Sequence, residues 1–241
     1  MTTPVTLPQL DETVLATQRY LGALTELEDD QVRRPSVLPG WTRAHVIAHL
    51  ARNADALTQV LRRVSNGEQG YMYSSQESRD ADIETTATSD LSELTRYTQE
   101  ACAAFEAAAA ELDPERLDAM VSRTPDSDPA FPASRVGLMR RTELEVHHAD
   151  LDIGYTSADW PTDFTLSLIK RRQDGLADLE GGGPSMVLSS TDVDGLWKLG
   201  AGQGPEILGT AADLAWWLTG RGDGRGLTCS AGELPRLGKW A

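Results

Sequence analysis

The chain of 241 residues contains 37 acidic and 22 basic residues, which gives a formal net charge of -15. A hydrophobic content of 40% and a charged content of 24% are typical of a soluble globular protein and exclude a disordered chain. The negative charge argues against nucleic acid and anionic membranes as partners, because both are negatively charged themselves. No stretch approaches the roughly 20 apolar residues of a membrane span, and the N-terminus lacks a signal-peptide pattern. We therefore expect a cytoplasmic protein, and its acidity does not exclude a small anion as a partner.

The two cysteines, Cys102 and Cys229, are far apart in the sequence and neither belongs to a CxxC motif. Two ordinary thiols in a reducing compartment explain this better than a disulfide. The sequence does not specify an oligomeric state, and it is compatible with a monomer.

The first part of the chain has the pattern of a helical bundle. Leucines at helical spacing predict a first helix that begins at Leu10 and ends at the polar residues 28–30. Thr42 is a predicted N-cap for a second helix, which ends near Gly67. A loose segment, residues 71–88, precedes a third helix over residues 89–112, and a fourth is expected over residues 134–152. Four helices with short connections predict a four-helix bundle over residues 1–155.

The remaining residues, 156–241, predict a smaller α/β domain. A helix is expected from Thr162, followed by short strands at residues 185–189, 196–199 and 206–208. Thr210 would cap a further helix that ends at Gly220, and residues 227–230 form a last predicted strand. The fold class is therefore α+β, a helical bundle with an appended α/β domain.

All four histidines lie in two short patches, one on the second predicted helix and one on the fourth. Glu143 and His147 are four residues apart and project from one helical face. With an imidazole from the other helix they would supply three nitrogen and oxygen ligands, a set that suits zinc in a catalytic site. Helical phase favours His49, on the more apolar face, over His45, and favours His147 over His148. Asp150 follows His147 by three residues and could orient its imidazole.

Each of these features also has a purely structural interpretation. A Glu-x3-His pair often occurs on a solvated helix face, and a histidine among apolar residues is often a hydrogen-bonded core residue. The glycine-rich segment 220–226 contains Arg221, which could hold a carboxylate with its two parallel donors, or the segment could be a flexible surface turn.

The run Gly-Trp-Thr-Arg-Ala-His-Val-Ile-Ala-His-Leu, residues 40–50, resembles the N-terminal signature of mycothiol-dependent maleylpyruvate isomerases. These belong to the wider group of DinB-like metal-binding helical bundles. Further matches follow in order at residues 67–73, 139–151, 220–222 and 232–235, so the resemblance covers nearly the whole chain. Many metal-binding relatives share the signature of the bundle. The C-terminal Gly-Arg-Gly and the tail restrict the resemblance to the maleylpyruvate isomerases.

The resemblance implies that His49, Glu143 and His147 bind a divalent metal, with zinc the expected ion, and that Arg221 is required for activity. It implies mycothiol as the thiol cofactor and cis–trans isomerisation of maleylpyruvate to fumarylpyruvate, a step in gentisate-type aromatic breakdown. His45 and His148 receive no role. Arg52 and Arg79 lie near the matched segments and could assist anionic groups, but neither is assigned to the site. Two alternatives remain: another mycothiol-dependent S-transferase on the same scaffold, and a non-catalytic metal- or ligand-binding regulator.

Overall fold

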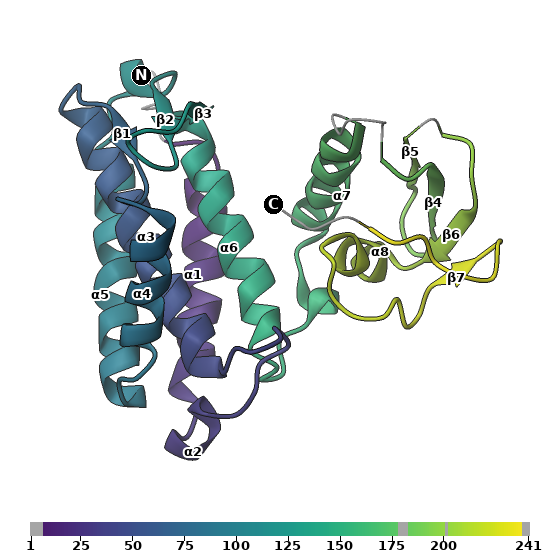
Figure 1. The fold of residues 1–241 in the computed structure, drawn as a ribbon, viewed down its shortest axis with the longest axis horizontal. Helices are drawn as coiled ribbons and strands as arrows, with labels where there is room; N and C mark the ends of the chain where they lie inside the picture. The colour runs from purple at the N-terminus through teal and green to yellow at the C-terminus, as the bar shows by residue number, and fades with distance from the viewer. Residues whose placement is uncertain (1–6, 178–182, 201, 238–241) are drawn as a thin grey trace. The chain divides into compact units, whose positions relative to one another are not determined.

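The computed structural model describes residues 7–177, 183–200 and 202–237. The chain divides into two compact units, Met1–Gly154 and Tyr155–Ala241. The first is mostly helical, and the second combines helices with a sheet (Figure 1). This is the expected α+β class.

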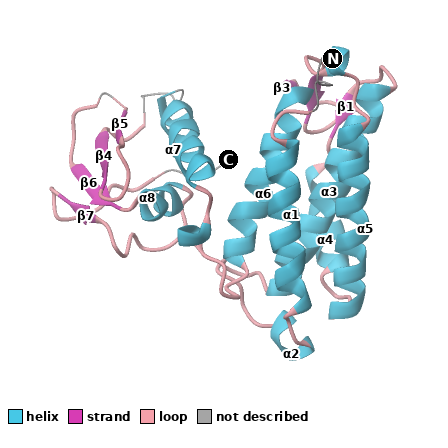
Figure 2. Cartoon of the chain, turned by 180° about the vertical axis from the view of Figure 1, so that it is seen from behind, coloured by secondary structure: helices cyan, strands magenta, loops and turns pink. Residues whose placement is uncertain are grey.

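Four long helices of the described residues form the bundle in the first unit (Figure 2): α1 (Leu10–Thr25), α3 (Arg43–Ser65), α5 (Leu91–Ala110) and α6 (Val136–Asp150). A single turn, α2 (Asp29–Val32), follows α1. The helices begin where the sequence predicts: Asp90 accepts a hydrogen bond from the Glu93 backbone N–H, and Thr42 caps α3. Short 3-10 turns flank the elements at Pro114–Arg116, Ala133–Arg135 and Ser157–Asp159.

The buried face of α1 matches the predicted leucine pattern (Leu15, Leu21, Leu24 and Leu27) only in part. Leu15 is 54% exposed, whereas Tyr20 and Leu24 are buried together with small and hydroxyl residues. Thr13 donates a hydrogen bond to the carbonyl of Gly137, so α1 and α6 pack closely at this point. The α3 helix follows its predicted face, which buries Val46, Leu50, Leu57 and Leu61.

The prediction of a loose segment over residues 71–88 was wrong in part, because residues Gln76–Thr86 form a helix, α4. Ser75 caps it by accepting a hydrogen bond from the Ser78 backbone N–H. Only Ile83 and Thr86 of this helix are buried, so it lacks the apolar repeat by which an amphipathic helix is identified.

A small sheet of the first unit was also not predicted. Its strands β1 (Gly70–Tyr71), β2 (Met120–Ser122) and β3 (Pro129–Pro132) lie in that order, with β1 and β2 parallel and β2 and β3 antiparallel. Strands β1 and β2 carry too few residues to show an alternating pattern, and β3 begins and ends with proline, which argues against a strand.

The second unit follows its prediction closely. Helix α7 (Thr162–Ala177) precedes a sheet in the order β5-β4-β6-β7. Its strands are β4 (Met186–Ser190), β5 (Leu196–Leu199), β6 (Glu206–Gly209) and β7 (Thr228–Cys229). Thr210 caps α8 (Ala211–Leu218), and Gly220, with a φ of 73°, follows its end. Both cysteines are free thiols, and no helix of the described residues is long and apolar enough to cross a membrane.

Candidate metal centre

His49 lies in the second turn of α3, and its side chain is 5% exposed. Its Nε2 lies 2.8 Å from the Glu143 Oε2, and its Nδ1 lies 3.3 Å from the Arg79 Nη2. The indole of Trp41, just before α3, covers the imidazole at a ring-centroid distance of 5.6 Å. Helix α3 thus presents one imidazole to α6 in surroundings that largely exclude water.

Helix α6 contributes the other two side chains from a single face. Glu143 and His147 are one turn apart, and the His147 Nε2 lies 3.3 Å from the Glu143 Oε2. On the opposite side of the ring, the His147 Nδ1 lies 2.8 Å from the Oδ2 of Asp150, whose side chain is fully buried. Asp150 therefore lies where the sequence places an orienting carboxylate.

His49, Glu143 and His147, which we call the triad, have one potential ligand atom each within 4.8 Å of the others. Both Nε2 atoms face the same carboxylate oxygen, and the imidazole rings meet edge to face at a centroid distance of 4.6 Å. Two imidazole nitrogens and one carboxylate oxygen form a donor set that suits zinc, with room for a further ligand. The buried Asp150 behind His147 matches the carboxylates that commonly support metal-binding histidines.

The charges of the triad also suit a cation. Burial, together with the proximity of His147, lowers the pKa of His49 to about 4, so this imidazole is neutral at pH 7. Burial alone would raise the pKa of Glu143, but hydrogen bonds to His147 and His49 hold it well below its usual range. Burial opposes the charged form of His147 as well, yet Asp150 and Glu143 raise its pKa. Glu143 and His49 are thus already in the forms that bind a metal ion, whereas a cation would have to displace the proton that Asp150 and Glu143 favour on His147.

The other two histidines lie outside the triad. The Nδ1 of His45 lies 3.2 Å from the backbone nitrogen of Thr42, where it completes a capping box at the start of α3. Its Nε2 lies 3.3 Å from Glu84. His148 is buried against the ring of Tyr20. The structure therefore brings together the two histidines that helical phase selects and gives the other two different surroundings.

Arg221 lies in the second unit, on the loop that follows α8. Its Nη1 donates a hydrogen bond to the carbonyl of Thr219, and its guanidinium lies 5.8 Å from the ring centroid of Trp216. The glycines on either side, Gly220 and Gly222, both have positive φ, which a glycine adopts without strain. The loop thus has a defined conformation around Arg221.

Trp41 and Tyr73 lie beside the triad and received no site role from the sequence. Arg79, also beside the triad, was named there only as a residue that could assist anionic groups. The pKa of Tyr73 is raised by burial and by the charge of Glu143, against the lowering effect of the nearby Arg79 guanidinium. No spacing rule indicates these residues. Arg79 in particular comes from α4, the helix without an apolar repeat. Arg52 instead donates a hydrogen bond to the Thr86 hydroxyl and lies over the ring of Tyr97.

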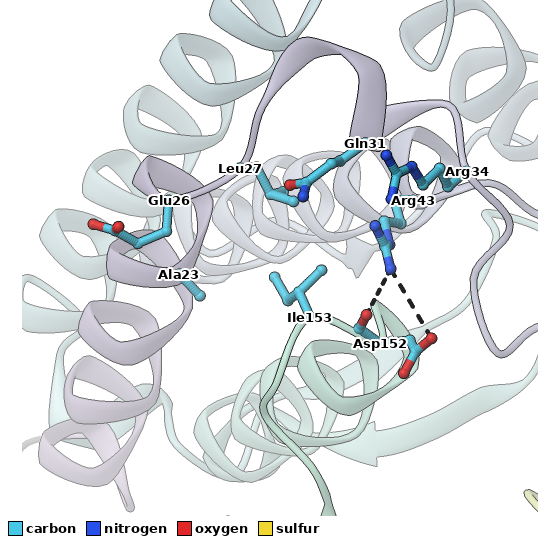
Figure 3. Close-up of a pocket in the computed structure, with 8 residues that line it drawn as sticks. All are labelled: Ala23, Glu26, Leu27, Gln31, Arg34, Arg43, Asp152 and Ile153. Atoms are coloured by element: carbon cyan, nitrogen blue, oxygen red, sulfur yellow. Dashed lines mark hydrogen bonds and ion pairs between the residues drawn. The ribbon is translucent and has the colours of Figure 1, made fainter.

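A separate pocket lies in the first unit between the end of α1 and the start of α3. Figure 3 shows Arg43 directed at Asp152, with its Nη2 2.6 Å from the Asp152 carbonyl oxygen. None of the residues that line it belongs to the triad: Ala23, Glu26, Leu27, Gln31, Arg34, Arg43, Asp152 and Ile153.

Comparisons with known proteins show which family the chain is similar to. Residues 14–152 match the family model of the mycothiol maleylpyruvate isomerase N-terminal domain. A crystal structure of the mycothiol-dependent maleylpyruvate isomerase is similar with a TM-score of 0.88 and 28% identity, over 99% of this chain and all of that chain. The structure of a histidine-to-alanine mutant of that enzyme gives the same TM-score and coverage at 27% identity. No curated protein sequence matches this chain significantly.

Proposed function

Because the chain belongs to the mycothiol maleylpyruvate isomerase family, we propose that it catalyses the mycothiol-dependent cis–trans isomerisation of maleylpyruvate to fumarylpyruvate. The proposal includes zinc as the metal, the cytoplasm as the compartment and gentisate-type aromatic breakdown as the setting. The observation that supports it most is the triad, in which two imidazole nitrogens and a carboxylate oxygen converge within 4.8 Å.

In this proposal His49, Glu143 and His147 hold the divalent metal. A cation bound there would keep the thiol of mycothiol ionised near neutral pH, as the nucleophile whose reversible addition makes the substrate's double bond rotatable. The Asp150 carboxylate lies 2.8 Å from the His147 Nδ1 and favours a proton on that nitrogen, which would leave the Nε2 lone pair for the metal. Burial of His49 limits the access of water that would compete for the site.

Arg221 has the second role in the proposal. Its planar guanidinium can form two parallel hydrogen bonds to a substrate carboxylate and can offset negative charge that develops on the adjacent enolate oxygen. The protein's own thiols have no part in the reaction. Cys102 is 1% exposed, which suits a structural thiol.

The test is an isomerase assay on the full chain loaded with zinc. Maleylpyruvate is incubated with a small, substoichiometric amount of mycothiol, and the change of the enol absorbance from that of the cis isomer to that of the trans isomer is followed. We expect complete conversion, loss of activity with a chelator and recovery with added zinc. Absence of turnover in the loaded protein would contradict the proposal.

The substoichiometric thiol separates isomerisation from S-transfer. An isomerase regenerates the thiol in every cycle, whereas a transferase stops after one equivalent has been consumed and leaves a conjugate that mass spectrometry detects. Conversion that ends at the amount of mycothiol added would therefore favour the transferase alternative.

A further inference from the structure

Arg79 brings a positive charge to the triad from a third helix, α4. Its Nη2 lies 3.3 Å from the His49 Nδ1, and its guanidinium lies 5.7 Å from the ring centroid of Tyr73. The Arg79 side chain is 20% exposed. It is thus fixed beside a metal-ligand candidate and remains open to solvent.

The donors of Arg79 are held by partners that a ligand can replace. Its Nη1 donates to the Asp80 Oδ1 at 2.8 Å, but the Asp80 side chain is 57% exposed. An ion pair with so exposed a carboxylate is strongly screened by water and contributes little, so an incoming carboxylate can take its place.

The hydrogen bond to His49 depends on the tautomer of the imidazole. The Nε2 of His49 faces Glu143, so Nε2 is the nitrogen at the candidate metal position. A neutral imidazole that gives the lone pair of Nε2 to a cation carries its proton on Nδ1. Nδ1 is then a donor and no longer accepts from Arg79. A cation in the triad therefore frees the Nη2 donors of Arg79 beside the metal ligands.

The freed donors suit a carboxylate in particular. Glu143 and Asp150 are acidic and the chain has a net charge of -15, so a dianionic substrate needs local positive charge. A guanidinium matches the two oxygens of a carboxylate with parallel hydrogen bonds. We propose that Arg79 binds one carboxylate of a small dicarboxylate substrate next to the triad. The identity of that substrate rests on the proposed function.

The test is calorimetric titration of the zinc-loaded full chain with maleate, a small cis-dicarboxylate. Charge-assisted, paired hydrogen bonds lead us to expect about 10- to 100-fold weaker maleate binding in Arg79→Gln. Arg79→Lys keeps the charge without the planar fork. Its maleate affinity should therefore lie between those of the wild type and Arg79→Gln. Arg62→Gln is the matched control, because Arg62 is exposed on α3, 13 residues beyond His49, or about 20 Å along the helix. It should bind maleate like the wild type.

A zinc titration of the metal-free variants separates ligand binding from structural support. Arg79→Gln should bind zinc at least as tightly as the wild type, because it removes a donor that opposes the loaded tautomer of His49. Maleate binding in Arg79→Gln that equals the Arg62→Gln control would overturn the proposal, and so would loss of zinc from both Arg79 variants. If maleate binds through Arg79 but maleylpyruvate is not turned over, the proposed function fails and this anion site stands. If maleylpyruvate is turned over but Arg79→Gln binds maleate normally, this anion site fails and the proposed function stands.

Discussion

Asp150 offers a direct test of how α6 prepares His147 for a metal. Its carboxylate is fully buried, and its Oδ2 lies 2.8 Å from the His147 Nδ1. Asp150→Asn preserves the shape of the side chain and one oxygen but removes the negative charge. The change therefore weakens the charge interaction that keeps the proton of His147 on Nδ1 and leaves its Nε2 for the metal.

The expected loss follows from this geometry. Removing a carboxylate that supports a metal-binding histidine typically lowers metal affinity by about 10- to 100-fold, or about 1.4 to 2.8 kcal/mol. We expect a loss in this range for Asp150→Asn, because the replaced oxygen is buried and in direct contact with the imidazole. The assay is a competition titration of metal-free protein with zinc and a chromogenic chelator.

Asp152→Asn is the matched control. Asp152 lies two residues further on, its side chain is 76% exposed, and its Oδ2 is 4.0 Å from the Arg43 Nη2. Its φ is 55°, a conformation that asparagine tolerates well. Zinc affinity should remain that of the wild type. Equal affinities in both variants, with equal thermal stability, would refute the orienting role of Asp150.

Four further predictions concern the metal, the substrate and the fold. His49→Ala should lose both zinc and activity, whereas His45→Gln, which can still complete the capping box, should keep zinc; stoichiometric metal in His49→Ala by elemental analysis would contradict the assignment. Arg221→Ala should keep zinc but lose turnover in the isomerase assay, and full activity would exclude its catalytic role. In the metal-free protein, unfolded His49 takes up its proton near pH 6.5, whereas burial lowers the pKa of the folded residue to about 4. The neutral imidazole therefore contributes up to about 3 kcal/mol to the free energy of unfolding above pH 6.5, and this contribution is lost as the pH falls to 4. Denaturant titrations should show a smaller fall in the free energy of unfolding between pH 6.5 and 4 for His49→Gln than for the wild type. Equal falls in the two proteins would contradict this. Gly137→Ala would place a Cβ 2.2 Å from the Pro8 carbonyl oxygen and should lower the free energy of unfolding by about 1–3 kcal/mol. Gly22→Ala, whose Cβ meets open space, is the control and should not destabilise the protein. Equal melting temperatures of the two variants would show that α6 adjusts freely.

Local chemistry in the sequence was sufficient to predict the frame of the site. Thr42 and Asp90 start their helices as predicted, and helical phase selected His49 and His147 over their neighbours. These features depend on residues within one or two turns of each other, so a single helix contains the whole signal. The prediction that α3 and α6 are in contact rested on the resemblance and on the chemistry of the metal ligands.

Features that depend on packing between distant segments were not predictable. Leu15 is exposed and Tyr20 is buried on α1, because close contact with Gly137 selects a face rich in small and hydroxyl residues. Arg140 is fully buried and donates hydrogen bonds to the Leu50 carbonyl and to Asn53. No charge pattern on α6 indicates that this arginine is buried. Arg79 reaches the triad from α4 for a similar reason, because its place depends on tertiary contacts and not on periodicity.

The separation of the triad residues along the chain links metal binding to folding. His49 and Glu143 are 94 residues apart in sequence and come from different helices of the bundle. A metal ion coordinated by both would act as a cross-link that closes this long loop, and the unfolded chain does not assemble the same ligands. Stabilisation then grows with the logarithm of the free metal concentration above the dissociation constant. The melting temperature of residues 1–154 is therefore a gauge of metal occupancy, and it can be measured without any substrate.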